Sequence, residues 1–177
     1  MNYKTLKSTT LVQGRVFDLR RDEVRFPSGN THTLDIVDHG GAVCIAALDP
    51  DGKLLLVRQY RHATAGMLLE FPAGTLEEGE EPEACAQREL REEAGYGARQ
   101  MEKLGEFFLS PGYSTQVMHL YFAQDLFAEQ LEGDEDEELE IERLALPEAR
   151  TAVADGEIRD AKTIIAVLML EKRIEAD

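Results

Sequence analysis

Residues 74–96 read GTLEEGEEPEACAQRELREEAGY, and this stretch predicts an acidic loop that runs into a helix. Pro82 suits the first helical position, and Gly95 suits a left-handed cap at the other end. Between them, small and apolar residues recur at four-residue spacing, at Ala86, Leu90 and Ala94. The stretch therefore predicts a helix over about residues 82–94.

This helix carries three glutamates on one face. Glu89, Glu92 and Glu93 stand at i, i+3 and i+4, so their carboxylates project together, one turn apart. Like charges at this spacing repel, and a bound divalent cation would turn that repulsion into a ligand set. Oxygen ligands alone favour magnesium or manganese. The alternative is a solvated acidic face, which is common in a chain with 35 acidic residues.

The composition limits the class of protein. A chain of 177 residues, 43% hydrophobic and 31% charged, is typical of one principal globular domain. A net charge of −16 without a basic stripe argues against non-specific binding to nucleic acid. The longest apolar run, residues 164–170, is too short for a membrane span, and the N-terminus lacks the apolar core of a secretory signal. We therefore expect a cytoplasmic protein with no nucleic-acid or membrane partner, in which Cys44 and Cys85 are buried free thiols.

The N-terminal section predicts strands. Residues 12–38 alternate apolar and polar side chains around a turn at residues 27–30, which indicates an antiparallel hairpin or small sheet. A section of about 40 residues does not close a core alone, so we expect it to pack on the main domain or on a second subunit.

The rest of the chain mixes strands and helices. Residues 42–48 and 53–60 predict a buried hairpin. Shorter strands are expected near residues 68–71, 105–109, 117–122 and 139–145, followed by helices at 147–154 and 161–174. Antiparallel strands with a few outer helices favour an α+β protein, built as a helix–sheet–helix sandwich, over a doubly wound parallel fold.

The spacing within residues 74–96 resembles the signature of the Nudix hydrolase family. Gly74, five residues, Glu80, seven residues, Arg88-Glu89-Leu90, one residue, Glu92-Glu93, one residue and Gly95 follow that pattern, and only the last position departs, with Tyr96 in place of an aliphatic residue. The resemblance implies a Nudix-type α/β/α sandwich with a mixed sheet, a small N-terminal antiparallel β-sheet, and cleavage of a diphosphate by activated water.

The same resemblance implies a magnesium site, with manganese as an alternative. Its ligands would be Glu89, Glu92, Glu93 and the backbone carbonyl of Ala73, and Glu92 would also count among the catalytic residues. Arg88 would orient the carboxylates through ion pairs, and Gly74 would let the backbone approach the metal. Divalent cations and local arginines would reverse the repulsion between an anionic substrate and a chain of charge −16.

A general base is expected in the acidic run GDEDEE at residues 133–138. By similarity to bacterial ADP-ribose pyrophosphatases, Glu135 and Glu137 are the candidates, and Glu137 is also a candidate metal ligand. The residues alone do not choose between them. The alternative is a solvated acidic loop.

Further segments resemble the ADP-ribose pyrophosphatase branch of the family, namely residues 57–61, 69–74, 110–112 and 160–164. The Ser-Pro-Gly element is the strongest part of this resemblance, because Pro111 follows Tyr96 at the distance that is characteristic of this branch. The resemblance implies that the substrate is contacted by Arg58, Arg61, Glu70, Phe17, Pro111 and Gly112. The alternatives are surface arginines at a strand end, a core phenylalanine and an ordinary turn.

A member of this branch would hydrolyse ADP-ribose to AMP and ribose 5-phosphate as a homodimer. Residues 1–40 would form the N-terminal sheet, for dimerisation and base binding, and residues 41–177 the catalytic domain. Gln116 stands where relatives usually have a glutamate, so GDP-mannose or another nucleotide sugar is the alternative substrate. A non-catalytic ADP-ribose-binding module is a third reading. The dispersed histidines, His32, His39, His62 and His119, are assigned no role.

Overall fold

Strand β4, Ala42–Leu48, lies at the centre of the fold and serves two cores. The computed structural model describes residues 2–132 and 139–175. Because side chains alternate along a strand, Ala42, Cys44 and Ala46 face one layer, and the intervening residues of β4 face the other. Residues 42–47 of the strand are all buried, so β4 separates two helical layers.

The main sheet is mixed. Its strand order is β10–β5–β4–β9–β8, with β6 paired to β5 and β7 paired to β4. The pair β4 and β9 is parallel, and the other pairs are antiparallel. The remaining strands of this sheet are β5 (Leu54–Arg61), β6 (Gly66–Glu70), β7 (Ala73–Thr75), β8 (Tyr96–Phe108), β9 (Val117–Ala128) and β10 (Glu140–Leu144), and the 3-10 turn η1 (His62–Thr64) follows β5.

Strands β4 and β5 pair beside their connecting turn and then diverge. Their register contains the pairs Ala47↔Leu55 and Leu48↔Leu54. Farther from the turn, β6 pairs with β5 and β7 pairs with β4. Residues 66–75 therefore cross from the edge of β5 to the edge of β4. The amide of Ile45 donates to the Pro72 carbonyl at the crossing point. This divergence carries the chain from β5 to the loop that precedes the first helix.

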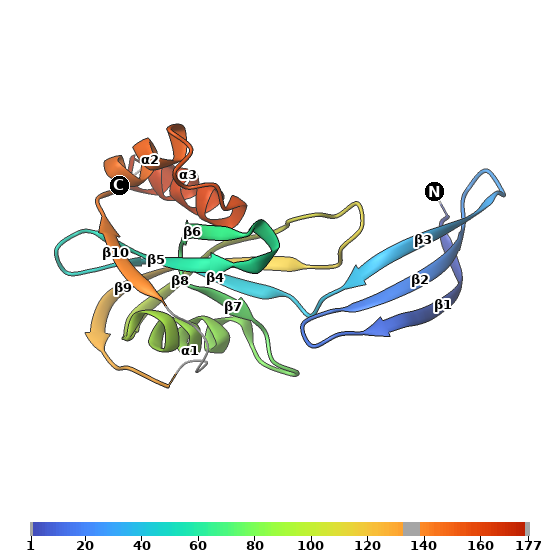
Figure 1. Ribbon diagram of the computed structural model, residues 1–177, viewed down its shortest axis with the longest axis horizontal. Helices are drawn as coiled ribbons and strands as arrows, with labels where there is room; N and C mark the ends of the chain where they lie inside the picture. The colour runs from blue at the N-terminus through green and yellow to red at the C-terminus, as the bar shows by residue number, and fades with distance from the viewer. Residues whose placement is uncertain (1, 133–138, 176–177) are drawn as a thin grey trace.

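Helices cover both faces of the main sheet (Figure 1). Helix α1 (Pro82–Ala94) lies on one face, and α2 (Leu146–Ala154) and α3 (Ala161–Glu175) lie on the other. Pro82 opens α1, and Gly95 closes it in a left-handed conformation, as the sequence predicts. The α/β/α sandwich with a mixed sheet is therefore confirmed, as are the two buried free cysteines.

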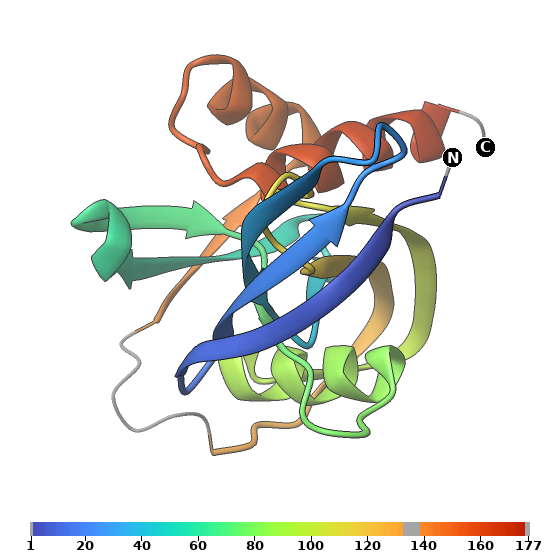
Figure 2. The ribbon, with the colours of Figure 1, turned by 90° about the vertical axis from the view of Figure 1, so that its right-hand side faces the viewer.

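A separate antiparallel sheet of three strands projects from the sandwich (Figures 1 and 2). It consists of β1 (Lys4–Gln13), β2 (Asp18–Arg25) and β3 (Thr31–Asp38). The predicted strands correspond to β2 and β3, whereas β1 begins well before residue 12. Every residue of β1 is exposed, so it has no buried face to impose an apolar–polar alternation that a sequence pattern could reveal.

Other boundaries also differ from the prediction. Strand β8 begins at Tyr96, directly after the helix cap, instead of near residue 105, and β9 continues to Ala128. A register shift between Lys103 and Gly105 interrupts β8 and breaks its alternation, which hides its first half from pattern analysis. Within residues 2–132 and 139–175, no helix is long and apolar enough to span a bilayer.

Candidate active site

The loop at Gly74 and the middle of α1 are in close contact. A Cβ atom at residue 74 would overlap the carboxylate of Glu89, so only glycine permits this approach. On the same side of the loop, the amide of Ala73 donates to Oε2 of Glu93 at 3.0 Å. Two of the three predicted metal ligands on α1 therefore lie against the backbone of β7.

Arg88 connects the carboxylates of the loop and helix. Its Nε and Nη2 donate to the two oxygens of Glu80, each at 2.9 Å, in a bidentate pair. Its Nη1 donates to Glu89 at 2.6 Å and to Glu92 at 2.9 Å. One guanidinium thus offsets the mutual repulsion of three nearby carboxylates.

The hydrogen bond from Arg88 lowers the pKa of Glu80 to about 2. The same pairing, opposed by burial, raises the pKa of Arg88 above its ordinary value. Both groups are therefore charged at neutral pH. Glu80 anchors Arg88 from the loop side, while Arg88 reaches Glu89 and Glu92 on the helix side.

The donor chemistry of this cluster fits a hard divalent cation. Three carboxylates share one helix face, and the Gly74 backbone lies in contact with one of them without a side chain between. Among the residues that the structure describes, no three acidic, histidine or cysteine side chains converge closely enough to form a ready-made metal cage. The reason is visible in the contacts, because Arg88 and the Ala73 amide hold the carboxylates in intramolecular hydrogen bonds.

Arg61 and Glu70 form a second charged pair, at the open end of β5 and β6. Arg61 donates through Nε and Nη2 to the two oxygens of Glu70, at 3.0 and 2.9 Å. The side chain of Glu70 is 1% exposed, whereas that of Arg61 is 37% exposed. The structure therefore places Arg61 at the surface and Glu70 beneath it.

Arg58 lies apart from this pair. It donates to Glu142 of β10 and, at 3.1 Å, to Glu157 after α2. These contacts tie the edge strand β10 and the α2–α3 connection to β5. Arg58 is thus held by two carboxylates that belong to other elements.

Phe17, Pro111 and Gly112 lie around the junction of the N-terminal sheet with the sandwich. Phe17 is half exposed and precedes Asp18, which pairs with Asp38 at the end of β3. Pro111 and Gly112 are exposed in a turn closed by the hydrogen bond from the Tyr113 amide to the Ser110 carbonyl.

The loop of residues 110–116 is bound to β3. The Val37 amide donates to the Tyr113 carbonyl at 2.8 Å, and the Thr115 amide donates to the Val37 carbonyl at 3.0 Å. The Thr115 hydroxyl also donates to Asp38 at 3.1 Å. Gln116 lies at the end of this loop, and its backbone N–H donates to the Ser114 hydroxyl at 3.2 Å. The loop that carries the Ser-Pro-Gly element is thus hydrogen-bonded to the N-terminal sheet.

Glu135 and Glu137 lie outside the described residues. On one side of this run, the Leu131 amide donates to the Arg91 carbonyl and Gln130 donates to the Glu92 carbonyl, so the chain leaves from the last turn of α1. On the other side, Glu140 opens β10 opposite Arg58. The described residues before the run are therefore bound to the last turn of α1.

Sequence reasoning assigned no role to the first turn of α3. There Lys162 forms a buried ion pair with Glu70, and Thr163 accepts a hydrogen bond from the Phe71 amide at 3.0 Å. The only signal in the sequence is the Asp160-Ala161-Lys162-Thr163 segment at a helix start, where Asp160 accepts from the amide and hydroxyl of Thr163.

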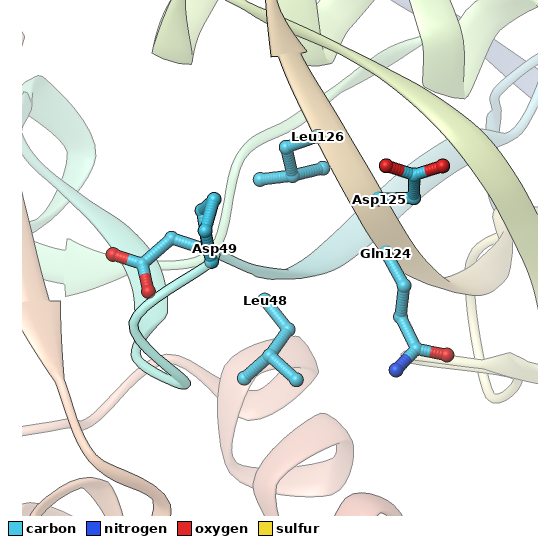
Figure 3. Close-up of a pocket in the computed structure, with 6 residues that line it drawn as sticks. Leu48, Asp49, Gln124, Asp125 and Leu126 are labelled. Atoms are coloured by element: carbon cyan, nitrogen blue, oxygen red, sulfur yellow. The ribbon is translucent and has the colours of Figure 1, made fainter.

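A shallow hollow elsewhere on the molecule is not part of this site. It lies between the β4–β5 turn and β9 and is lined by Leu48, Asp49, Pro50, Gln124, Asp125 and Leu126 (Figure 3). The half of β4 that pairs with β7 is Ala42 to Cys44, at the other end of the strand. The side chains of Asp49 and Asp125 point away from one another, so this hollow offers no convergent acidic pair (Figure 3).

The Glu80–Arg88 pair yields a pH-dependent stability. Because folding lowers the pKa of Glu80 from 4.5 to about 2, the pair stabilises the protein above pH 4.5 and loses this effect as the pH falls toward 2. Glu80→Gln should lower the free energy of unfolding at pH 7 by about 1 kcal/mol, since solvent screens a pair near the surface. This difference in the free energy of unfolding should shrink as the pH is lowered, and urea titrations in EDTA measure it.

Glu78→Gln, in the same exposed loop, is the control and should leave the free energy of unfolding unchanged. A loss of stability in Glu80→Gln that does not depend on pH would contradict the assignment.

Comparisons with known proteins agree with this geometry. The model of the NUDIX domain family matches residues 38–167. The chain is 38% identical to an ADP-ribose pyrophosphatase of Bacillus subtilis, over 98% of this chain and 96% of that protein. It is 41% identical to a methanol dehydrogenase activator of Bacillus methanolicus, over 95% and 92%. It is also 36% identical to a GDP-mannose pyrophosphatase of Salmonella paratyphi B, over 96% and 89%.

A solved structure shows the same architecture. The crystal structure of an ADP compounds hydrolase superposes with a TM-score of 0.88 and 28% identity, covering 99% of this chain and 96% of that one. The matched family region contains the Glu80–Arg88 pair with the α1 carboxylates, and also the ion pairs that Glu70 makes with Arg61 and Lys162. The chain belongs to the NUDIX domain family and is a Nudix hydrolase.

Proposed function

We propose that the protein hydrolyses the diphosphate bond of ADP-ribose to AMP and ribose 5-phosphate. One observation carries the proposal: Arg61 and the carboxylates of α1 flank the same short segment, residues 70–74. At most about 11 Å of extended chain separates Glu70, which holds Arg61, from Ala73, which holds Glu93. A guanidinium and a metal-binding cluster at this spacing suit the two ends of one diphosphate.

The residues divide the chemistry between them. Glu89, Glu92, Glu93 and the Ala73 carbonyl would hold magnesium, with manganese as an alternative, and the bound ion would neutralise the diphosphate and lower the pKa of water. Arg88 keeps Glu89 and Glu92 aligned. Arg61 would bind the diphosphate from the opposite side. Glu135 or Glu137 would take the proton from the attacking water, and replacing each by glutamine in turn would identify the base.

The N-terminal sheet is proposed to complete the site in a homodimer. Its exposed apolar residues would be covered by a second copy of the chain, and they are Tyr3, Leu6, Leu11, Val12, Val16 and Leu34. Phe17 would stack on the adenine. Sedimentation of the protein as a monomer at micromolar concentration would refute this arrangement.

The first test concerns the carboxylates of α1. Glu93→Gln retains an oxygen that accepts the Ala73 amide, so folding should be little affected. Turnover should fall by about 100-fold or more, because a charge that holds the metal is lost. The measurement is kcat for ADP-ribose with magnesium, alongside the free energy of unfolding. Glu83→Gln, at an exposed position of the same helix, is the matched control. An unchanged kcat in Glu93→Gln would exclude Glu93 as a ligand.

The second test concerns the substrate. We expect purified protein with magnesium to convert ADP-ribose to AMP and ribose 5-phosphate, and chromatography of the products identifies the cleaved bond. GDP-mannose is the alternative substrate for two reasons. Gln116 stands where a glutamate is expected, and one relative is named a GDP-mannose pyrophosphatase. Cleavage of GDP-mannose with ADP-ribose left intact would change the substrate and leave the class of reaction standing. Saturable ADP-ribose binding without turnover in any divalent metal would instead indicate a non-catalytic module.

A further inference from the structure

Lys162 is a buried cation between two carboxylates. Its Nζ donates to Oε2 of Glu70 and lies 3.0 Å from Oδ2 of Asp160. Burial opposes its charge, but Asp160 and Glu70 more than compensate and raise the pKa of Lys162. With 9% of its side chain exposed and its ammonium committed to these partners, Lys162 is not placed to touch a ligand.

Glu70 connects the buried Lys162 to Arg61 at the surface. One oxygen of this carboxylate binds both Lys162 and Nη2 of Arg61, and the other accepts from Nε of Arg61 at 3.0 Å. A buried carboxylate with a single cation would be costly and prone to protonation. Burial raises the pKa of Glu70, yet Arg61 and Lys162 together hold it below its ordinary value. The ionised carboxylate keeps both arms of the fork to Arg61.

The neighbouring residue anchors the same segment by its backbone. The hydroxyl of Thr163 accepts from the Phe71 amide at 3.0 Å and donates to Asp160 at 2.6 Å. The first turn of α3 therefore holds the side chain of residue 70 and the backbone of residue 71 at once. The chain then reaches Ala73 and Gly74, which lie against the carboxylates of α1.

We propose that Lys162 is a positioning residue for Arg61, acting through the buried carboxylate of Glu70 to aim the guanidinium at a nucleoside diphosphate. The inference rests on the proposed function, because it takes Arg61 as the group that meets the diphosphate. Arg61 alone on a flexible side chain would pay rotamer entropy on binding. The chain Asp160–Lys162–Glu70–Arg61 reduces that cost, because the guanidinium is already held before the ligand arrives.

The test is a double-mutant cycle on ligand affinity. The dissociation constant of ADP-ribose is measured by calorimetry in EDTA, where turnover is suppressed, for the unsubstituted protein, Lys162→Met, Arg61→Gln and the double variant. Lys162→Met should weaken binding about tenfold, the size expected for a lost charged hydrogen bond. In the Arg61→Gln background it should have less than about a twofold effect, because coupled residues are not additive. With magnesium, KM should rise and kcat should change less than about threefold.

Two further variants serve as a control and as a substitute if Lys162→Met does not fold. Lys172→Met removes an exposed lysine from the last turn of the same helix and should leave the affinity unchanged. If Lys162→Met does not fold, because Glu70 keeps only one cation, Lys162→Met/Glu70→Gln removes both buried charges and should bind ADP-ribose as weakly as Arg61→Gln.

The outcomes separate the two proposals. Unaltered affinity in folded Lys162→Met, or in Lys162→Met/Glu70→Gln, would overturn the positioning role alone. An equal loss with and without Arg61 would do the same, since it would mean that Lys162 does not act through that residue. Failure of the unsubstituted protein both to bind ADP-ribose in EDTA and to hydrolyse it with magnesium would overturn the proposed function and the positioning role together.

Discussion

The close contact between Gly74 and Glu89 is the constraint on which the rest of the site depends. Because no side chain separates them, β7 lies directly against α1, and the Ala73 amide reaches Glu93. Three carboxylates on one helix face would repel one another, and Arg88 relieves this by pairing with Glu80, Glu89 and Glu92. The cluster is thus held together by a glycine that permits the approach and an arginine that balances the charge. Helix α1 is anchored by Cys85, Ala86 and Leu90, which are buried against the sheet beside Glu89.

The divergence of β4 and β5 links the α1 carboxylates to the Arg61–Glu70 pair. Residues 66–75 pass between the diverging strands, so one short segment holds Arg61 at its start and the α1 carboxylates at its end. In a chain of net charge −16, an anionic substrate would be repelled by most of the surface. At this segment, the partly exposed guanidinium of Arg61 and a divalent metal bound at the α1 carboxylates would offset that repulsion. Lys162, although buried, contributes to this by keeping Glu70 ionised and Arg61 in place.

The N-terminal sheet is joined to the sandwich by specific contacts and not by a bare linker. The loop of residues 110–116 bonds to β3 on both sides of Val37, and Thr115 reaches Asp38. This places Phe17 and the Ser-Pro-Gly turn around one junction, although they are distant in the chain. The start of β4, which follows this junction, is flanked by β7 on one side and β9 on the other. The junction and the Gly74 loop therefore lie at the same end of β4.

The sequence by itself determined the features that depend on local spacing. Glycine and proline at its ends delimit α1, four-residue periodicity sets its buried face, and the positions of Glu89, Glu92 and Glu93 place their carboxylates together. The uninterrupted apolar run of β4 likewise predicted a buried strand, and the structure places it between two cores. The tertiary structure alone decided which distant residues meet. It joined Lys162 to Glu70, buried Glu70 beneath Arg61, drew Arg58 to Glu142 and Glu157, and formed β1 as a strand with no buried face. These contacts join residues far apart in the chain, and a single sequence contains no periodicity that relates one partner to the other.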